Sequence, residues 1–162
     1  MRKIEQLNKP EPFKLTGYIK LDIYDKYGVL KDTTGWKKNT ITTAGMAQMA
    51  LLGGVASAVP FTYLAVGVSA TAPSAAATAL VSEITGGDLA RATATVSRVT
   101  TDNSNDTLQL YKQWTASATH AIEEAGIFNA SAAGTMLGRA LTTTKTVNDT
   151  ETMTLTYKVK MS

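Results

Sequence analysis

The chain has 162 residues, enough for one domain that buries a core without metal or disulfide staples. Charged residues make up only 18%, and the net charge of +3 reflects a small excess of lysine, so the composition does not indicate nucleic-acid binding. The absence of cysteine excludes disulfides and thiol chemistry, and no stretch is long and apolar enough for a signal peptide or a membrane span.

The first segment, residues 1–16, is polar and contains Lys9, Pro10 and Pro12, with Phe13 directly after them. The prolines hold their neighbours in extended geometry and interrupt regular structure. We therefore expect an extended N-terminal arm over residues 1–16 and a single β-rich domain over residues 17–162. The arm is either a frayed tail or a strap that lies on a neighbouring subunit.

Residues 17–24 alternate between apolar and polar side chains, which predicts a strand, and a turn with a glycine at its end follows at residues 25–28. The chain then reaches a polar segment, residues 32–39, in which Trp36 stands beside Lys37 and Lys38. Two interpretations of the tryptophan are open. It either folds onto the core or is an exposed aromatic anchor for a partner, since tryptophan is enriched at the centres of interfaces.

A single short helix is expected over residues 44–52. Thr42 or Thr43 can cap its N-terminus, and the pair Gly53-Gly54 can end it. Met46 and Met49 share one face at helical spacing, and core packing is the simplest role for this face.

The central part of the chain alternates strand patterns with turn signals. Residues 69–78 are a loop of small residues, and a helical turn is expected at residues 79–83. A hairpin turn is expected at residues 102–106, and the threonine run 142–146 reads as a polar connection. The strands are expected at residues 61–68, 91–100, 107–118 and 121–128, with a return through residues 135–141.

Residues 152–161 alternate without a break between a threonine and lysine face and an apolar face, so they form a long half-buried strand. Such a strand needs other strands paired along it and a second layer over its apolar side. With roughly seven strands and one helix, the chain is expected to be mainly β, as a single β-sandwich or barrel-like domain.

Reactive groups are sparse. His120 is the one histidine and has no motif around it, and Glu123 and Glu124 are neighbours in a strand, so their carboxylates should point apart. Residues 102–106 are rich in oxygen ligands but lack the glycine and the glutamate that complete a calcium loop, so an Asx turn is favoured. We therefore expect no enzyme activity, no cofactor and no metal site.

Three stretches carry a family resemblance: residues 38–45 (KNTITTAG), residues 61–67 (FTYLAVG), and residues 122–128 (IEEAGIF) with 134–139 (GTMLGR). Their order, from about Asn39 onward, resembles small structural proteins of tailed bacteriophages. The resemblance implies a non-enzymatic virion protein that is made in the bacterial cytoplasm.

Two positions on the particle are compatible with this resemblance. The favoured one is a capsid decoration, or cement, protein that binds the major capsid protein as a homo-oligomer, such as a trimer. The alternative is a tail, baseplate or tail-fibre adaptor protein. The candidate partner-binding residues are Lys9, Pro10, Pro12, Phe13, Trp36, Lys37 and Lys38, and neither nucleic acid nor membrane is an expected partner.

A third reading, from another class, is a carbohydrate-binding β-sandwich that stacks sugars on exposed aromatic side chains. The candidate platforms are Trp36, Tyr63 and Trp114.

Overall fold

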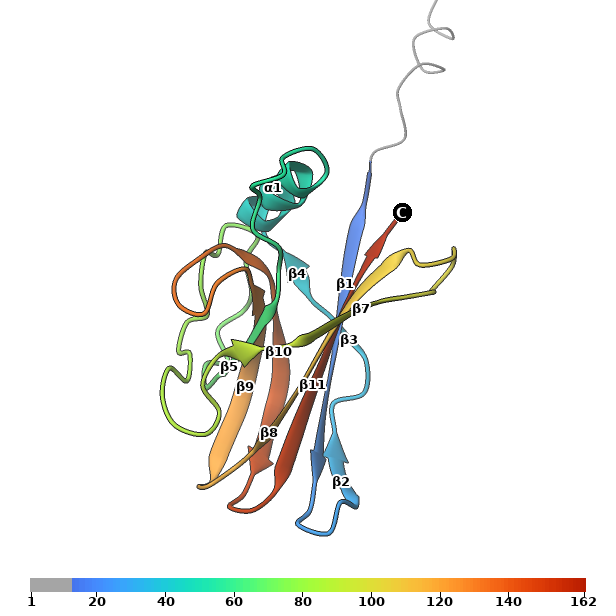
Figure 1. Cartoon of the computed structure of the whole chain (residues 1–162). Coiled ribbons are helices and arrows are strands. Elements are labelled where there is room, and N and C mark those ends of the chain that lie inside the picture. The colour runs from blue at the N-terminus through green and yellow to red at the C-terminus, as the bar shows by residue number, and fades with distance from the viewer. Residues whose placement is uncertain (1–12) are drawn as a thin grey trace, which may run out of the picture.

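The computed structural model describes residues 13–162 and shows two antiparallel sheets packed face to face, with one helix at one end (Figure 1). The domain is therefore a β-sandwich and not a closed barrel. The mainly β fold with one short helix is as the alternating patterns predict.

The first sheet, sheet A, has six strands in the order β2-β1-β11-β8-β7, with β3 also paired to β1. The strand β11 lies in the middle and pairs with β1 through ten residue pairs and with β8 through nine. Its central place follows from its length and its two-faced pattern. The bounds are β1 Leu15–Tyr24, β2 Leu30–Thr33, β3 Lys37–Lys38, β7 Thr95–Val99, β8 Thr107–Thr115 and β11 Thr152–Met161.

The second sheet, sheet B, has five strands in the order β4-β10-β9-β5-β6. The strand β5 is buried along Leu64–Gly67, as expected for a strand covered on both faces. The segment expected as one strand at residues 91–100 divides between the sheets, because β6 pairs with β5 and β7 pairs with β8. The bounds are β4 Thr40–Ile41, β5 Tyr63–Gly67, β6 Ala92–Thr93, β9 His120–Phe128 and β10 Met136–Val147.

The core lies between the two sheets and contains the apolar face of β11. Tyr157 is fully buried there, and its hydroxyl group accepts a hydrogen bond from the side-chain amide of Asn39. Burial raises the pKa of Tyr157 well above its ordinary value, so this hydroxyl stays protonated. Asn39 precedes β4 and thereby links sheet B to the core face of sheet A.

The helix α1 (Thr43–Leu52) begins and ends where the capping residues predict. The Thr42 hydroxyl oxygen accepts a hydrogen bond from the backbone N–H of Gly45 at 2.9 Å, and Gly53 is the C-cap. The expected core packing of the methionine face is confirmed only for Met49, which is half-buried and packs against the core, whereas Met46 is 38% exposed and Gly45 is the buried residue of α1. The helix lies at the end of the sandwich (Figure 1).

Two local predictions are wrong for reasons of tertiary context. Residues 79–83 form no helical turn; they run as irregular backbone against sheet B, with an isolated bridge between Gly67 and Glu83. The threonine run 142–146 belongs to β10, where the pairing with β9 shifts register between Leu141 and Lys145. Such a bulge accepts extra residues without ending the strand.

The N-terminal prediction is only partly within the described residues. The strand β1 begins at Leu15, two residues before the expected start of the domain, and Lys14 exchanges backbone hydrogen bonds with Ser162. Lys9, Pro10 and Pro12 lie outside the described residues.

Candidate interaction surfaces

Sheet A turns one face to solvent, and its strand register decides which side chains share that face. Thr152, Thr156, Lys158 and Lys160 are half-exposed and alternate with the apolar residues of β11, as the sequence predicts, whereas Thr154 of the same face is buried by its neighbours. The register then places side chains of β1 and β8 beside them, such as Tyr24 next to Thr152 and Tyr111 next to Thr156. The result is a broad, mostly polar face that also carries aromatic rings.

Trp36 lies on this face and is 49% exposed, so the interpretation in which it folds onto the core is wrong. Its role as an anchor for a partner stays a prediction. The Nζ atom of Lys158 is 4.8 Å from the centre of the Trp36 ring, and that of Lys20 is 5.8 Å away. Both distances allow attraction between an ammonium group and an aromatic face. The ring is therefore held in place on the sheet while much of its surface stays in contact with water.

The two lysines that follow Trp36 have different roles. The Lys37 amine donates a hydrogen bond to the Thr143 hydroxyl of β10, so it joins the edges of the two sheets. Lys38 is exposed and is paired in register with Tyr18 of the solvent face. Phe13, at the start of the described chain, is 62% exposed. Of the predicted partner-binding residues that are described, Phe13, Trp36 and Lys38 are thus available at the surface.

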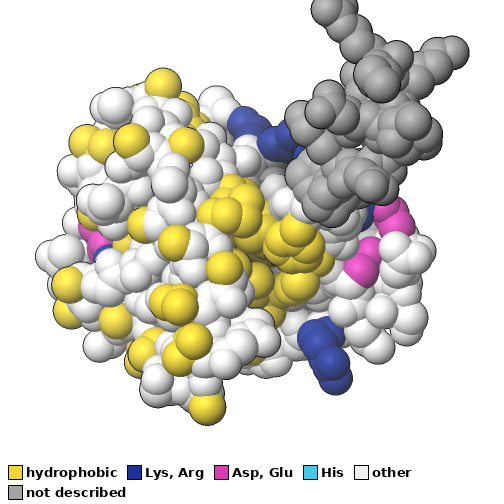
Figure 2. Space-filling view, turned by 90° about the horizontal axis from the view of Figure 1, so that it is seen from above, with side chains coloured by type: hydrophobic (Ala, Val, Ile, Leu, Met, Phe, Trp, Pro, Cys, Tyr) yellow, Lys and Arg dark blue, Asp and Glu magenta, His cyan; other side chains and the backbone are white. Residues whose placement is uncertain are grey.

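A second surface, which we call the uncharged end, consists of α1 and residues 53–60. No charged residue occurs between Lys38 and Glu83. Figure 2 shows hydrophobic side chains gathered on the face of the molecule that includes this end. The exposed large hydrophobic residues here are Met46, Leu51, Val55 and Val59, with exposures from 38 to 51%. Exposed apolar side chains that cluster in this way are typical of protein–protein interaction sites.

His120 has a partner that the sequence did not suggest. Its Nε2 atom lies 3.1 Å from the carboxylate of Asp88, which also accepts hydrogen bonds from the backbone N–H and the hydroxyl group of Ser117. The bond from the Ser117 backbone lowers the pKa of Asp88 to about 2. Because the Ser117 hydroxyl group donates to Asp88 and not to His120, these groups lack the arrangement that activates a serine nucleophile.

The neighbouring glutamates point to different partners, as predicted. Glu123 accepts a hydrogen bond from Thr144, whereas Glu124 is fully buried and pairs with Arg139 at 2.6 Å. Glu124 also accepts from the backbone N–H groups of Val81 and Ser82, and Arg139 donates to the Thr71 carbonyl oxygen at 2.8 Å. We call Glu124 and Arg139 the clamp, because together they hold residues 71–82 on sheet B.

The acidic loop at residues 102–106 is a closed turn, as predicted. The Asp106 carboxylate accepts hydrogen bonds from the backbone N–H groups of Thr101, Asp102 and Asn103, and this lowers its pKa. The Asp106 carboxylate therefore stabilises the turn in which it lies. Among residues 13–162, no group of three or more histidine, aspartate or glutamate residues has the geometry of a metal site.

The aromatic residues named for carbohydrate stacking are not equivalent. Trp114 is buried, and its indole N–H donates to the Ala90 carbonyl oxygen at 3.0 Å, so it cannot be a stacking platform. Tyr63 is half-buried in β5, and only Trp36 is widely exposed. The strand register places further rings on the outer face, namely those of Tyr18, Tyr24 and Tyr111.

The polar clusters described above are used within the fold, while aromatic and apolar side chains remain at the surface. This arrangement is that of a structural or binding protein, and the helix within residues 13–162 is too short to cross a membrane. A family model described as "Podophage GP4 fiber I protein gp80" matches residues 39–159. The chain belongs to this family and is therefore a structural protein of a tailed-phage virion. Neither a curated protein nor a solved structure matches the chain.

Proposed function

We propose that the chain is a non-enzymatic subunit of a virion fibre that binds a neighbouring virion protein through the surface around Trp36. The family description names a fibre protein, which supports this position on the particle. The observation that carries the binding role is the exposed Trp36 ring between Lys20 and Lys158. A rigid, half-exposed aromatic ring with flanking cations is typical of the residues that dominate binding energy.

The lysines around this ring favour a partner with an acidic surface. Lys38 and Lys158 carry positive charge on the same face, and neither makes an ion pair with another described residue. Phe13 and the residues before it add a second contact in this proposal, since Phe13 is exposed beside the start of β1. In such an interface, the apolar anchors at the centre supply most of the affinity, and the charges at the rim orient the partner.

The uncharged end supports association of the chain with copies of itself. Apolar surfaces without charge suit symmetric contacts, because the same patch on two subunits is self-complementary and no like charges meet. We therefore include a homo-oligomer, with a trimer as one possible size, in the proposed function.

The test is to prepare virions that carry Trp36→Ala and to measure the copy number of the protein per particle. We expect a reduced copy number with an unchanged melting temperature of the isolated chain, because Trp36 is outside the core. Tyr27→Ala is the matched control, since Tyr27 is 79% exposed in a turn away from Trp36. A normal copy number for Trp36→Ala would contradict the proposed anchor.

Electron cryomicroscopy of the same particles locates the protein. Density in a fibre supports the proposal, whereas density over the head lattice would favour the capsid decoration role that the sequence suggested first. The decoration role remains a prediction, and its partner would then be the major capsid protein.

A further inference from the structure

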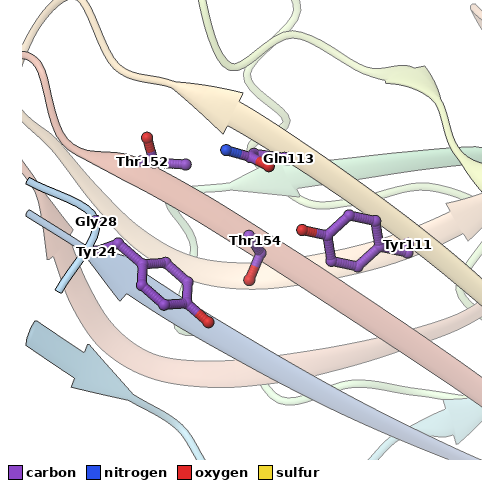
Figure 3. A pocket seen from close by; sticks show the side chains of 6 residues that line it. All are labelled: Tyr24, Gly28, Tyr111, Gln113, Thr152 and Thr154. Atoms are coloured by element: carbon purple, nitrogen blue, oxygen red, sulfur yellow. The ribbon is translucent and has the colours of Figure 1, made fainter. Parts of the chain in front are cut away.

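A groove of about 250 Å³ opens on the solvent face of sheet A. It is lined by Tyr24 of β1, Gly28 of the following turn, Tyr111 and Gln113 of β8, and Thr152 and Thr154 of β11. Figure 3 shows the two tyrosine rings on either side of Thr154, with their hydroxyl groups turned toward it. From this geometry we infer that the groove is a binding site for a neutral saccharide.

The first argument is the chemistry of the lining. A sugar ring presents an apolar C–H face and an edge of hydroxyl groups, and tyrosine offers an apolar ring together with a hydroxyl group. Threonine hydroxyls and the glutamine amide can both donate and accept hydrogen bonds, so they match hydroxyl groups in either role. Two rings on either side of such groups provide both kinds of contact at once.

The second argument is unused hydrogen-bonding capacity. Within residues 13–162, the side chains of Tyr24, Tyr111, Gln113, Thr152 and Thr154 make no hydrogen bond to another residue, although hydroxyl and amide groups elsewhere on the surface do so. Polar groups that the fold leaves free and that converge on one hollow are available to a ligand.

The third argument is charge. No charged side chain lines the groove, and the nearest acidic group on β1, Asp22, is neutralised by Lys20 at 2.7 Å. Two further hollows differ: one is lined by the ion pair of Arg91 with Glu83, and another contains Glu123. An uncharged lining favours a neutral ligand over a phosphate, a carboxylate or an acidic sugar.

The groove is also preorganised and well placed. Its side chains stand on β1, β11 and β8, which are paired along their full contact, so little ordering cost remains for binding. Tyr24 ends β1 and Thr152 begins β11, so the groove lies at the end of sheet A opposite Leu15 and Ser162 (Figure 1). A subunit held through its N-terminal end would thus present the groove outward.

The experiment uses the full chain and an array of neutral hexose and deoxyhexose oligosaccharides with sialylated counterparts, followed by titration calorimetry with the strongest neutral binder. We expect binding to neutral glycans, with affinity reduced about tenfold or more by Tyr111→Ala or Tyr24→Ala. Tyr111→Phe keeps the ring and loses only the hydroxyl group, so its loss should be smaller than that of Tyr111→Ala. Phe13→Ala removes another exposed ring, at the end of sheet A opposite the groove, so it is the control and should bind like the unmodified chain.

The variants change residues on the solvent face and should fold normally, which circular dichroism checks. A change in binding can then be assigned to the groove. Absence of binding by the unmodified chain to every neutral glycan on the array at millimolar concentration overturns the inference. Binding that survives both alanine variants, or that is confined to sialylated glycans, overturns it as well. The result is independent of the proposed attachment, since saccharide binding by the isolated chain does not require that the protein occupy a fibre.

Discussion

At the scale of single residues, the family motifs contain residues that hold segments of the fold together, and not reactive groups. Glu124 and Arg139 come from the third motif stretch, residues 122–128 with 134–139, and form the buried clamp that holds residues 71–82. Gly67 lies against it, since a Cβ atom there would be 2.6 Å from a Glu124 carboxylate oxygen. Glycine at this position thus leaves room for the buried carboxylate.

The clamp predicts a large effect for a small change. Glu124→Gln removes the negative charge and leaves the Arg139 guanidinium buried without its counter-ion, so we expect the free energy of unfolding to fall by about 3–5 kcal/mol. Glu123→Gln makes the same chemical change at the neighbouring, half-exposed residue and should lower the free energy of unfolding by less than about 1 kcal/mol. Urea denaturation of both variants measures the difference, and equal losses would refute the clamp.

Asp88 predicts a pH dependence. Its pKa of about 2 in the folded chain is below the ordinary value of 3.8, so it stabilises the fold above pH 3.8, and this contribution disappears as the pH falls toward 2. We expect Asp88→Asn to destabilise the protein at pH 6 and to differ progressively less from the unmodified chain between pH 4 and pH 2.

Thermal melting across this pH range checks the prediction. The control is Asp149→Asn, since the Asp149 carboxylate makes no hydrogen bond to another described residue and its replacement should give nearly parallel curves. A constant difference between Asp88→Asn and the unmodified chain from pH 6 to pH 2 would be inconsistent with the assigned role.

At the scale of elements, the segment from Asn39 to Gly45 joins three parts of the fold. Asn39 reaches the Tyr157 hydroxyl, Thr42 caps α1 and donates to the Met136 carbonyl oxygen, and Gly45 contacts β10. A Cβ atom at Gly45 would lie 2.4 Å from the Leu137 Cα atom. The helix can therefore approach sheet B only through a residue without a side chain.

Replacing this glycine should loosen the helix and spare the sheets. We expect Gly45→Ala to cost about 1–3 kcal/mol through overpacking, and to speed amide hydrogen exchange in residues 43–52 more than in β9 and β11. Gly54→Ala is the matched control, because a Cβ atom there meets nothing within 4 Å. If exchange in α1 stayed slow in Gly45→Ala, the close approach would not be what anchors the helix.

At the scale of the whole molecule, the two ends differ in character. One end has α1 and residues 53–60, which expose apolar side chains and carry no charge (Figure 1). The turns at the other end, beside the neutral groove, expose apolar residues such as Val29 but also carry charged residues such as Lys26 and Asp149. This difference in charge agrees with the proposed subunit, which is held at one end and presents the other.

The uncharged end predicts the behaviour of the isolated chain. If copies associate there, Leu51→Glu should place like charges at the contact and reduce the mass measured by light scattering to that of a monomer. Val29→Glu puts the same charge on a residue that is 62% exposed at the other end and should leave the mass unchanged. A chain that is monomeric before substitution at high micromolar concentration would count against the proposed self-association.

Patterns between near neighbours in the chain were enough to predict most of the architecture. The alternation over residues 152–161 predicts a long two-faced strand, and the threonine cap with two glycines predicts the bounds of α1, because both depend on local geometry. The start of the family match at residue 39 likewise agrees with motifs visible in the chain.

Contacts between residues that are far apart in the chain could not be predicted from such local patterns. The clamp, the exposure of Trp36 and the groove all depend on the order and register of the strands, which bring together residues such as Tyr24, Tyr111 and Thr154. Strand order follows from the balance of packing over the entire core, and a pairing shifted by one residue would send every one of these side chains to the opposite face. Folding in three dimensions was therefore needed to place the surfaces on which the proposed functions depend.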